Sequence, residues 1–194
     1  MAEDCCSPKG DEMSRAFIAL GVFLLTMPAC TVVTPSIVEQ RLQRTEDELA
    51  IRRVLYDYHW AIDNRDFDLY ASLFAKDGEF VTGSMVYKGP ERIRAMLVGI
   101  FGKTPPDYVN LDSIEITVNP EIEIDGDHAT VKSGAYLLEH GLDGNPMSVL
   151  VGGYDDQFVR EDGKWKIMHR IDHIYIPAPG EGVKLMPKRS KENQ

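Results

Sequence analysis

The segment from Asp47 to Phe80 constrains the fold more than any other part of the chain. It reads DELAIRRVLYDYHWAIDNRDFDLYASLFAKDGEF, which predicts an amphipathic helix, a break at residues 64–66, a short second helix and a strand. The first helix carries Tyr58 and ends at Asp63. A carboxylate at the inner end of an apolar helix is costly to bury unless it is paired or used. Asp63 is therefore the first candidate for a functional residue.

The remaining segments complete an α+β pattern. We expect the first helix to begin near Thr45, because Thr45 and Glu48 form a capping box. Asp66 is expected to cap the second helix, and Pro90 to open a third one that runs to residue 101. A hairpin over residues 79–87 and four long β segments, at residues 114–124, 128–139, 147–160 and 164–176, follow the helical pattern. Three helices on one face of a curved antiparallel sheet form a cone with one open mouth.

The composition excludes some classes of protein. The 194 residues carry a formal net charge of −10, and an acidic surface repels phosphate backbones, so we expect no nucleic-acid partner. Hydrophobic residues make up 43% of the chain and charged residues 27%, enough for one folded domain with terminal extensions.

The N-terminal residues are typical of an exported protein. Residues 13–30 read MSRAFIALGVFLLTMPAC, with a basic residue, an apolar run and small residues before Cys30. We expect Met13 to be the true start, residues 1–29 to be a signal region, and Cys30 to be lipidated as in a bacterial lipobox. A plain cleaved signal peptide and a hydrophobic anchor are the alternatives.

The other boundaries follow from composition. Residues 30–44 are expected to form a tether, residues 45–176 the domain, and residues 177–194 a flexible tail. All three cysteines, Cys5, Cys6 and Cys30, precede the domain, so it contains no disulfide. These features predict a protein of the bacterial cell envelope, anchored through Cys30 on the periplasmic side or otherwise exported.

Several motifs in this order resemble the SnoaL-like branch of the nuclear transport factor 2-like superfamily. They are Tyr58-x4-Asp63-x2-Asp66-Phe67-Asp68, Leu73-Phe74-x2-Asp77, Gly89-x3-Ile93, the segment from Asn119-Pro120 to Val131, and Asp162-Gly163-Lys164-Trp165-x-Ile167. The resemblance covers residues 45–176 and implies a cone-shaped α+β fold. Its relatives include scytalone dehydratase, polyketide cyclases and ketosteroid isomerase, together with non-catalytic binding domains.

The resemblance also implies a site. Asp63 falls at the position of the pocket aspartate of scytalone dehydratase, and His140 falls close to the histidine that pairs with it. Such a pair forms a general acid–base dyad. Active members often carry another histidine on the strand before Asn119, but residues 111–116 read LDSIEI and contain none.

Each candidate residue has a structural alternative. Asp63 could cap the helix break, Tyr58 could be a core residue rather than a proton donor, and His140 could lie at an exposed strand end. Strict alternation places His140 with Tyr136, opposite Ala129 and Val131, unless a bulge at Gly134 changes the face.

Alternation along the last strand places His169 on one face with Trp165 and Ile167, and Arg170 on the other. His169 is thus either a pocket residue or a hydrogen-bonded core histidine. His169, Tyr136 and Trp60 are the expected substrate-binding residues. We expect no metal, because the histidines form no compact ligand motif, and no other cofactor.

Two functions remain open from the sequence. The first is a cofactor-independent lyase or isomerase that acts on a small apolar molecule through Asp63, His140 and Tyr58. The second is a non-catalytic lipoprotein domain that binds a ligand or dimerises through the outer face of its sheet. We expect a homodimer in either case.

Overall fold

The computed structural model describes residues 35–140 and 145–177. The predicted signal region, the start at Met13, the lipidation at Cys30 and the tail beyond residue 177 lie outside these residues. None of the helices in the described ranges is long and apolar enough to cross a membrane.

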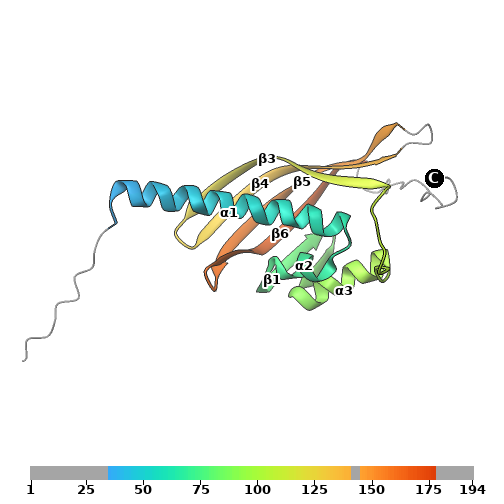
Figure 1. The fold of residues 1–194 in the computed structure, drawn as a ribbon, viewed down its shortest axis with the longest axis horizontal. Helices are drawn as coiled ribbons and strands as arrows, with labels where there is room; N and C mark the ends of the chain where they lie inside the picture. Colours follow the sequence, from blue (N-terminus) through green and yellow to red (C-terminus); the bar gives the residue numbers. More distant parts are fainter. Residues whose placement is uncertain (1–34, 141–144, 178–194) are drawn as a thin grey trace, which may run out of the picture. The chain divides into compact units, whose positions relative to one another are not determined.

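Within the described residues, the domain consists of three helices and six strands (Figure 1). The helices are α1 (Ile37–Asp63), α2 (Phe67–Ser72) and α3 (Pro90–Phe101). The strands are β1 (Phe74–Thr82), β2 (Met85–Lys88), β3 (Ser113–Asp125), β4 (His128–His140), β5 (Pro146–Glu161) and β6 (Lys164–Ile176).

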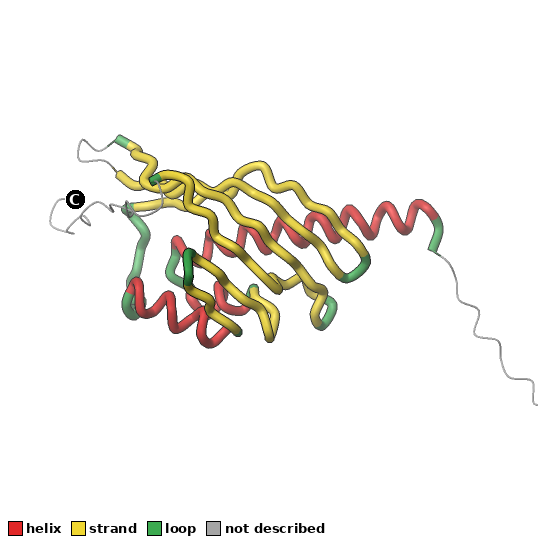
Figure 2. The backbone as a smooth tube through the Cα atoms, turned by 180° about the vertical axis from the view of Figure 1, so that it is seen from behind, coloured by secondary structure: helices red, strands yellow, loops and turns green. Residues whose placement is uncertain are grey.

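The strands form one curved sheet in the order β2-β1-β6-β5-β4-β3, so β3 is an edge strand. The helices lie on one face of this sheet (Figure 2), which confirms the expected α+β class and arrangement. One pair departs from the antiparallel pattern, because β1 runs parallel to β6. The two strands approach closely at Gly78, where a Cβ atom would lie only 2.7 Å from the carbonyl oxygen of Ile167.

The first helix begins earlier than the sequence pattern indicated. Its N-cap is Ser36, whose side chain accepts a hydrogen bond from the Glu39 N–H while Glu39 bonds back to Ser36. The expected capping box at Thr45 is therefore wrong, and residues 37–44 are helical rather than tether. The reason is that two capping boxes occur in the sequence, and the upstream one begins the helix.

One face of α1 packs on the sheet. The buried residues Ile51, Val54, Leu55 and Tyr58 recur at helical spacing. Leu49 lies outside this stripe and is exposed. The second half of α1 thus holds its inward face against the core, where the candidate site begins.

A buried ion pair lies at the centre of the sheet. The Arg170 side chain is fully buried on β6 and donates two hydrogen bonds of 2.7 Å to Asp156 on β5. The expected alternation is wrong at this point, because the β5–β6 register shifts between Phe158↔Ile167 and Gln157↔His169. Met168 is the extra residue of this bulge, and it turns Arg170 inward and His169 away.

Loss of the buried carboxylate should destabilise the domain strongly. Asp156→Ala leaves the Arg170 charge buried without its partner, so we expect the free energy of unfolding to fall by about 3–5 kcal/mol. Urea denaturation at pH 7 measures this change.

Asp155→Ala is the matched control, because Asp155 lies next in sequence and its ion pair with His173 is exposed. It should change the free energy of unfolding by less than about 1 kcal/mol. Equal losses from both variants would contradict the central role of the buried pair.

Candidate functional site

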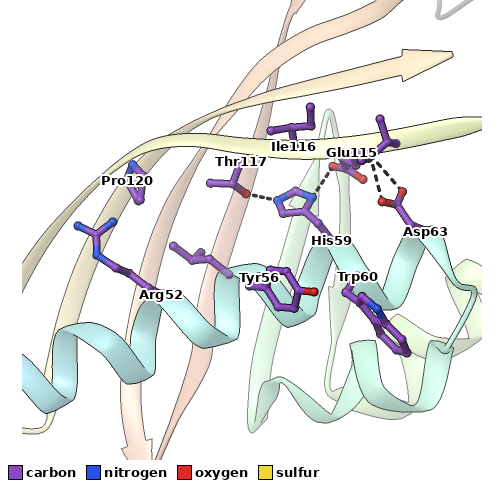
Figure 3. A pocket seen from close by; sticks show the side chains of 11 residues that line it. Arg52, Tyr56, His59, Trp60, Asp63, Glu115, Ile116, Thr117 and Pro120 are labelled. Atoms are coloured by element: carbon purple, nitrogen blue, oxygen red, sulfur yellow. Dashed lines mark hydrogen bonds and ion pairs between the residues drawn. The ribbon is translucent and has the colours of Figure 1, made fainter.

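A pocket of about 460 Å³ lies between α1 and the edge strand β3 (Figure 3). Its wall combines apolar and aromatic side chains with two carboxyl groups, an imidazole, a guanidinium and two hydroxyls. From α1 come Arg52, Leu55, Tyr56, His59, Trp60 and Asp63, and from β3 come Ile114, Glu115, Ile116, Thr117 and Pro120.

Asp63 is the last residue of α1 and lines this pocket. The backbone N–H of Glu115 donates to the two oxygens of its carboxylate, at 3.1 and 3.4 Å. Because β3 is an edge strand, the carboxylate satisfies an N–H that has no neighbouring strand. Burial raises the pKa of Asp63 to about 7; the N–H of Glu115 lowers it and the charge of Glu115 raises it further.

Glu115 and His59 face each other beside Asp63 (Figure 3). The Nδ1 atom of His59 lies 3.5 Å from Oε1 of Glu115, and its Nε2 atom contacts the hydroxyl of Thr117. Burial raises the pKa of Glu115, but the facing His59, the Tyr154 hydroxyl and the Arg170 charge together bring it below its usual value. Glu115 is therefore ionised at neutral pH.

A cluster of tyrosines supports Glu115 from the core. The Tyr154 hydroxyl donates a 2.6 Å hydrogen bond to Oε1 of Glu115. The guanidinium carbon of Arg170 lies 4.2 Å from the centre of the Tyr154 ring and 3.9 Å from that of Tyr58. These contacts fix Tyr154, and through it the position of the Glu115 carboxylate.

Tyr58, an expected catalytic residue, belongs to this core cluster. It is only 2% exposed, does not line the pocket, and its hydroxyl bonds to that of Tyr70. Burial raises its pKa to about 12. Tyr58 is therefore a core residue, which is the structural alternative to a proton donor that the sequence left open.

The structure does not bring Asp63 and His140 together. In the ranges 35–140 and 145–177, no ion pair joins the two, and Nε2 of His140 lies 3.6 Å from Oδ1 of Asp112. Alternation along β4 buries Ala129, Val131 and Ala135 and turns His140 to the other face. The β3–β4 register shifts at residues 119–120 of β3 and the β4–β5 register shifts between Leu137 and Leu138, so neither shift lies at Gly134. The expected Asp63–His140 pairing is thus corrected.

The three expected substrate-binding residues have different positions. Trp60 lines the pocket and is 43% exposed. His169 lies 3.5 Å from Glu79 on β1, because the bulge at Met168 turns it away from the pocket. Tyr136 lies on the outer face of β4 and is 39% exposed. Of the three, only Trp60 borders the pocket.

Three residues of the site and its support were not predicted from the sequence: His59, Glu115 and Arg170. His59 precedes Asp63 by four residues, which places both on one face of a helix, so the spacing alone could have indicated it. Within the described residues, no three His, Cys, Asp or Glu side chains gather in a way that could hold a metal ion.

Comparisons with known proteins agree with this architecture. A family model described as a SnoaL-like domain matches residues 43–171. An uncharacterized protein of Mycobacterium tuberculosis is 28% identical over 148 residues, which span 74% of this chain and 94% of that protein.

Solved structures share the fold at low identity. A nuclear transport factor 2-like protein of Novosphingobium aromaticivorans superposes with a TM-score of 0.61 at 19% identity, covering 76% of this chain and 95% of that one. A hexachlorocyclohexane dehydrochlorinase from Novosphingobium barchaimii gives 0.59 at 22% identity, covering 76% and 99%. A putative scytalone dehydratase from N. aromaticivorans gives 0.57 at 21% identity, covering 79% and 95%. These likenesses confirm the fold.

The raised pKa of Asp63 predicts how stability depends on pH. The folded state holds this proton more tightly than the unfolded state, so the contribution to stability is present below about pH 4 and is lost as the pH rises to about 7. The difference between a pKa of about 7 and the ordinary value of 3.8 corresponds to about 4 kcal/mol. Solvent screening of this partly exposed group reduces the expected loss to roughly 1–2 kcal/mol.

Asp63→Asn should remove this loss, because an amide does not titrate and its oxygen still accepts the N–H of Glu115. Urea denaturation of both proteins at pH 4, 6 and 8 measures the difference. Glu46→Gln, exposed on the same helix, should leave the wild-type pH dependence unchanged. Parallel pH curves for wild type and Asp63→Asn would contradict the raised pKa.

Proposed function

The chain belongs to the SnoaL-like domain family, and we propose that it is a cofactor-independent lyase or isomerase. Its substrate is a small, largely apolar molecule bound between α1 and β3, and Asp63 transfers the proton. The observation that carries this proposal is a carboxyl group in an apolar pocket with its pKa raised to about 7. Both protonation states of such a group are populated at neutral pH, so the group can accept and return a proton.

A second carboxyl group, that of Glu115, supports the proposed role of Asp63 in proton transfer. Burial raises the pKa of Asp63, whereas the groups around Glu115 outweigh burial and lower its pKa. Two neighbouring carboxyl groups with pKa values pushed apart are a typical arrangement in acid–base enzymes. Asp63 is then the group that exchanges a proton, and Glu115 is the fixed negative charge beside it.

The lining of the pocket supports the class of substrate. Trp60, Tyr56, Ile116 and Pro120 offer apolar surface, whereas the polar groups gather where α1 ends against β3. A volume of about 460 Å³ lies in the ordinary range for small-molecule sites. The names of two solved neighbours, a dehydrochlorinase and a putative dehydratase, both describe eliminations and support a lyase.

The cellular location and the oligomeric state of the protein are part of the proposal. We propose that Cys30 carries a lipid anchor in a bacterial envelope, supported by the MPAC sequence at residues 27–30. A homodimer through the outer face of the sheet is supported by exposed apolar side chains there, such as Tyr136 and Tyr175.

A second candidate function is ligand binding without turnover. The hydrogen bond from the Glu115 N–H gives Asp63 a structural role at the strand edge, which is the observation that favours this candidate. Catalysis and binding differ in their response to Asp63→Asn, because a binding domain keeps its affinity when this acceptor is preserved.

Proton exchange in heavy water tests the proposed function directly. The full-length protein is incubated with a panel of small aromatic and alicyclic ketones, and proton NMR follows deuterium entry next to the carbonyl. We expect wild type to accelerate exchange of at least one ketone, and Asp63→Asn to lower that rate by about 100-fold or more. The Glu46→Gln variant should match wild type.

Two results would contradict the proposal. Wild-type protein that accelerates exchange of no ketone would exclude this chemistry for the panel. Equal rates in wild type and Asp63→Asn would remove Asp63 from the reaction and favour the binding function.

A further inference from the structure

We infer that the outer face of α1 binds the same face of a second copy of this chain. The two helices run antiparallel and are related by a two-fold axis at Leu49. This interface lies on a different part of the molecule from the sheet face proposed above for the homodimer. It does not depend on the proposed acid–base chemistry, but it does bring residues of the partner to the rim of the pocket.

The first ground is a row of exposed apolar side chains along α1, which we call the outer stripe. Its members are between 43% and 74% exposed, and they are Val38, Leu42, Leu49, Tyr56 and Trp60. At 3.6 residues per turn they lie within about 40° of one another around the helix. The buried residues Ile51, Val54 and Tyr58 lie on the opposite side. A contiguous exposed apolar surface of this kind marks an interaction site.

The second ground is the spacing of the outer stripe. Leu42, Leu49 and Tyr56 recur every seven residues, which is the repeat that allows two helices to pack along a common line. From Val38 to Trp60 the stripe is about 33 Å long, at 1.5 Å per residue. The stripe therefore has the form of a surface that pairs with another helix.

The third ground is the symmetry of the outer stripe about Leu49. Leu42 and Tyr56 lie seven residues to either side of it, and Val38 and Trp60 lie eleven residues to either side. An antiparallel partner therefore places its Tyr56 against Leu42 and its Trp60 against Val38, and the two Leu49 side chains meet at the axis. A closed two-fold interface requires a surface that is complementary to itself in this way.

The charges beside Leu49 favour the antiparallel direction. Glu48 precedes Leu49, whereas Arg52 and Arg53 follow it. In an antiparallel pair, Glu48 of each helix lies beside Arg52 of the other helix. A parallel pair instead brings Arg52 of one helix against Arg53 of the other. Because charges beside the seam set the orientation of paired helices, the antiparallel arrangement is favoured.

A lipid surface is the other occupant that an exposed apolar helix face can take. Helices that lie on membranes carry an excess of basic residues on their polar face. α1 has four arginines and six acidic residues, and two of the arginines are already paired, Arg52 with Glu48 and Arg53 with Asp57. The helix thus presents no basic face to anionic lipids, and a second copy fits it better.

The pairing also changes the pocket between α1 and β3. Tyr56 and Trp60 belong both to the outer stripe and to the lining of this pocket. The partner's Leu42 and Val38 pack against these two rings on the side that faces away from β3. Each copy therefore extends the apolar rim of the other copy's pocket.

Disulfide trapping in the full-length chain tests the pairing and its direction. Cys5, Cys6 and Cys30 are replaced by serine, one cysteine is introduced in the outer stripe, and the protein is oxidised and run on a gel without reductant. We expect Leu49→Cys to form a disulfide between two copies, because the two residues meet at the axis. A mixture of the single variants Val38→Cys and Trp60→Cys should form a mixed disulfide.

Val38→Cys alone is the matched control. Val38 is more exposed than Leu49, at 74% against 62%, so random collision would link it at least as readily. In the antiparallel pair the two copies of residue 38 lie at opposite ends of the seam, about 33 Å apart. Val38→Cys alone should therefore stay monomeric on the gel.

A charge at the axis provides a second test. Leu49→Asp places two carboxylates against each other, so we expect it to raise the dissociation constant of this pairing by about 100-fold or more, measured by analytical ultracentrifugation. Ile100→Asp on α3 changes a side chain of similar exposure, 65%, and should leave the dissociation constant unchanged. Circular dichroism confirms that both variants are folded.

Three results would overturn the inference. Equal linking of Leu49→Cys and Val38→Cys would exclude the antiparallel pairing. The absence of any disulfide in the single variants and in the mixture would exclude pairing through α1. Absence of disulfides together with binding to phosphatidylglycerol vesicles that Leu49→Asp weakens would assign the outer stripe to a lipid surface. None of these results bears on proton exchange by Asp63, so the proposed function is tested separately.

Discussion

The hydrogen bond from the Glu115 N–H to the Asp63 carboxylate is the contact on which the site depends. It joins the last residue of α1 to the edge of β3, and so sets the separation of the two elements that form the pocket. It also satisfies a backbone donor that an edge strand would otherwise leave to solvent. The same contact keeps the carboxyl group partly buried, and burial is what raises its pKa.

The core behind the pocket makes this arrangement rigid. Arg170 and Asp156 are buried together, and the Arg170 guanidinium lies against the rings of Tyr58 and Tyr154. Tyr154 in turn holds the Glu115 side chain. A charged core is expensive to build, because each ion must lose its water. In this fold, the buried ion pair fixes Tyr154, and Tyr154 positions the Glu115 carboxylate at the pocket wall.

The sequence predicted the fold well and the site only in part. Helix periodicity, turn residues and the motif order gave the α+β cone, and the burial argument led to Asp63. Strict alternation failed on β6, because the bulge at Met168 turns Arg170 inward and His169 away, and nothing local in the sequence marks that bulge. His140 was misplaced for a related reason: it could face the pocket only with a bulge at Gly134, and the β3–β4 register shift lies instead at residues 119–120 of β3.

The most direct test of the account is the titration of one carboxyl group. Carbon-13 NMR of protein labelled at aspartate carboxyl carbons, with Asp63→Asn used to assign the signal, follows Asp63 from pH 3 to pH 9. The account predicts an apparent pKa of about 7 for this group, which shifts when a ligand fills the pocket. A midpoint near the ordinary value of 3.8 would show that Asp63 only covers the edge of β3, and would contradict its role in proton transfer.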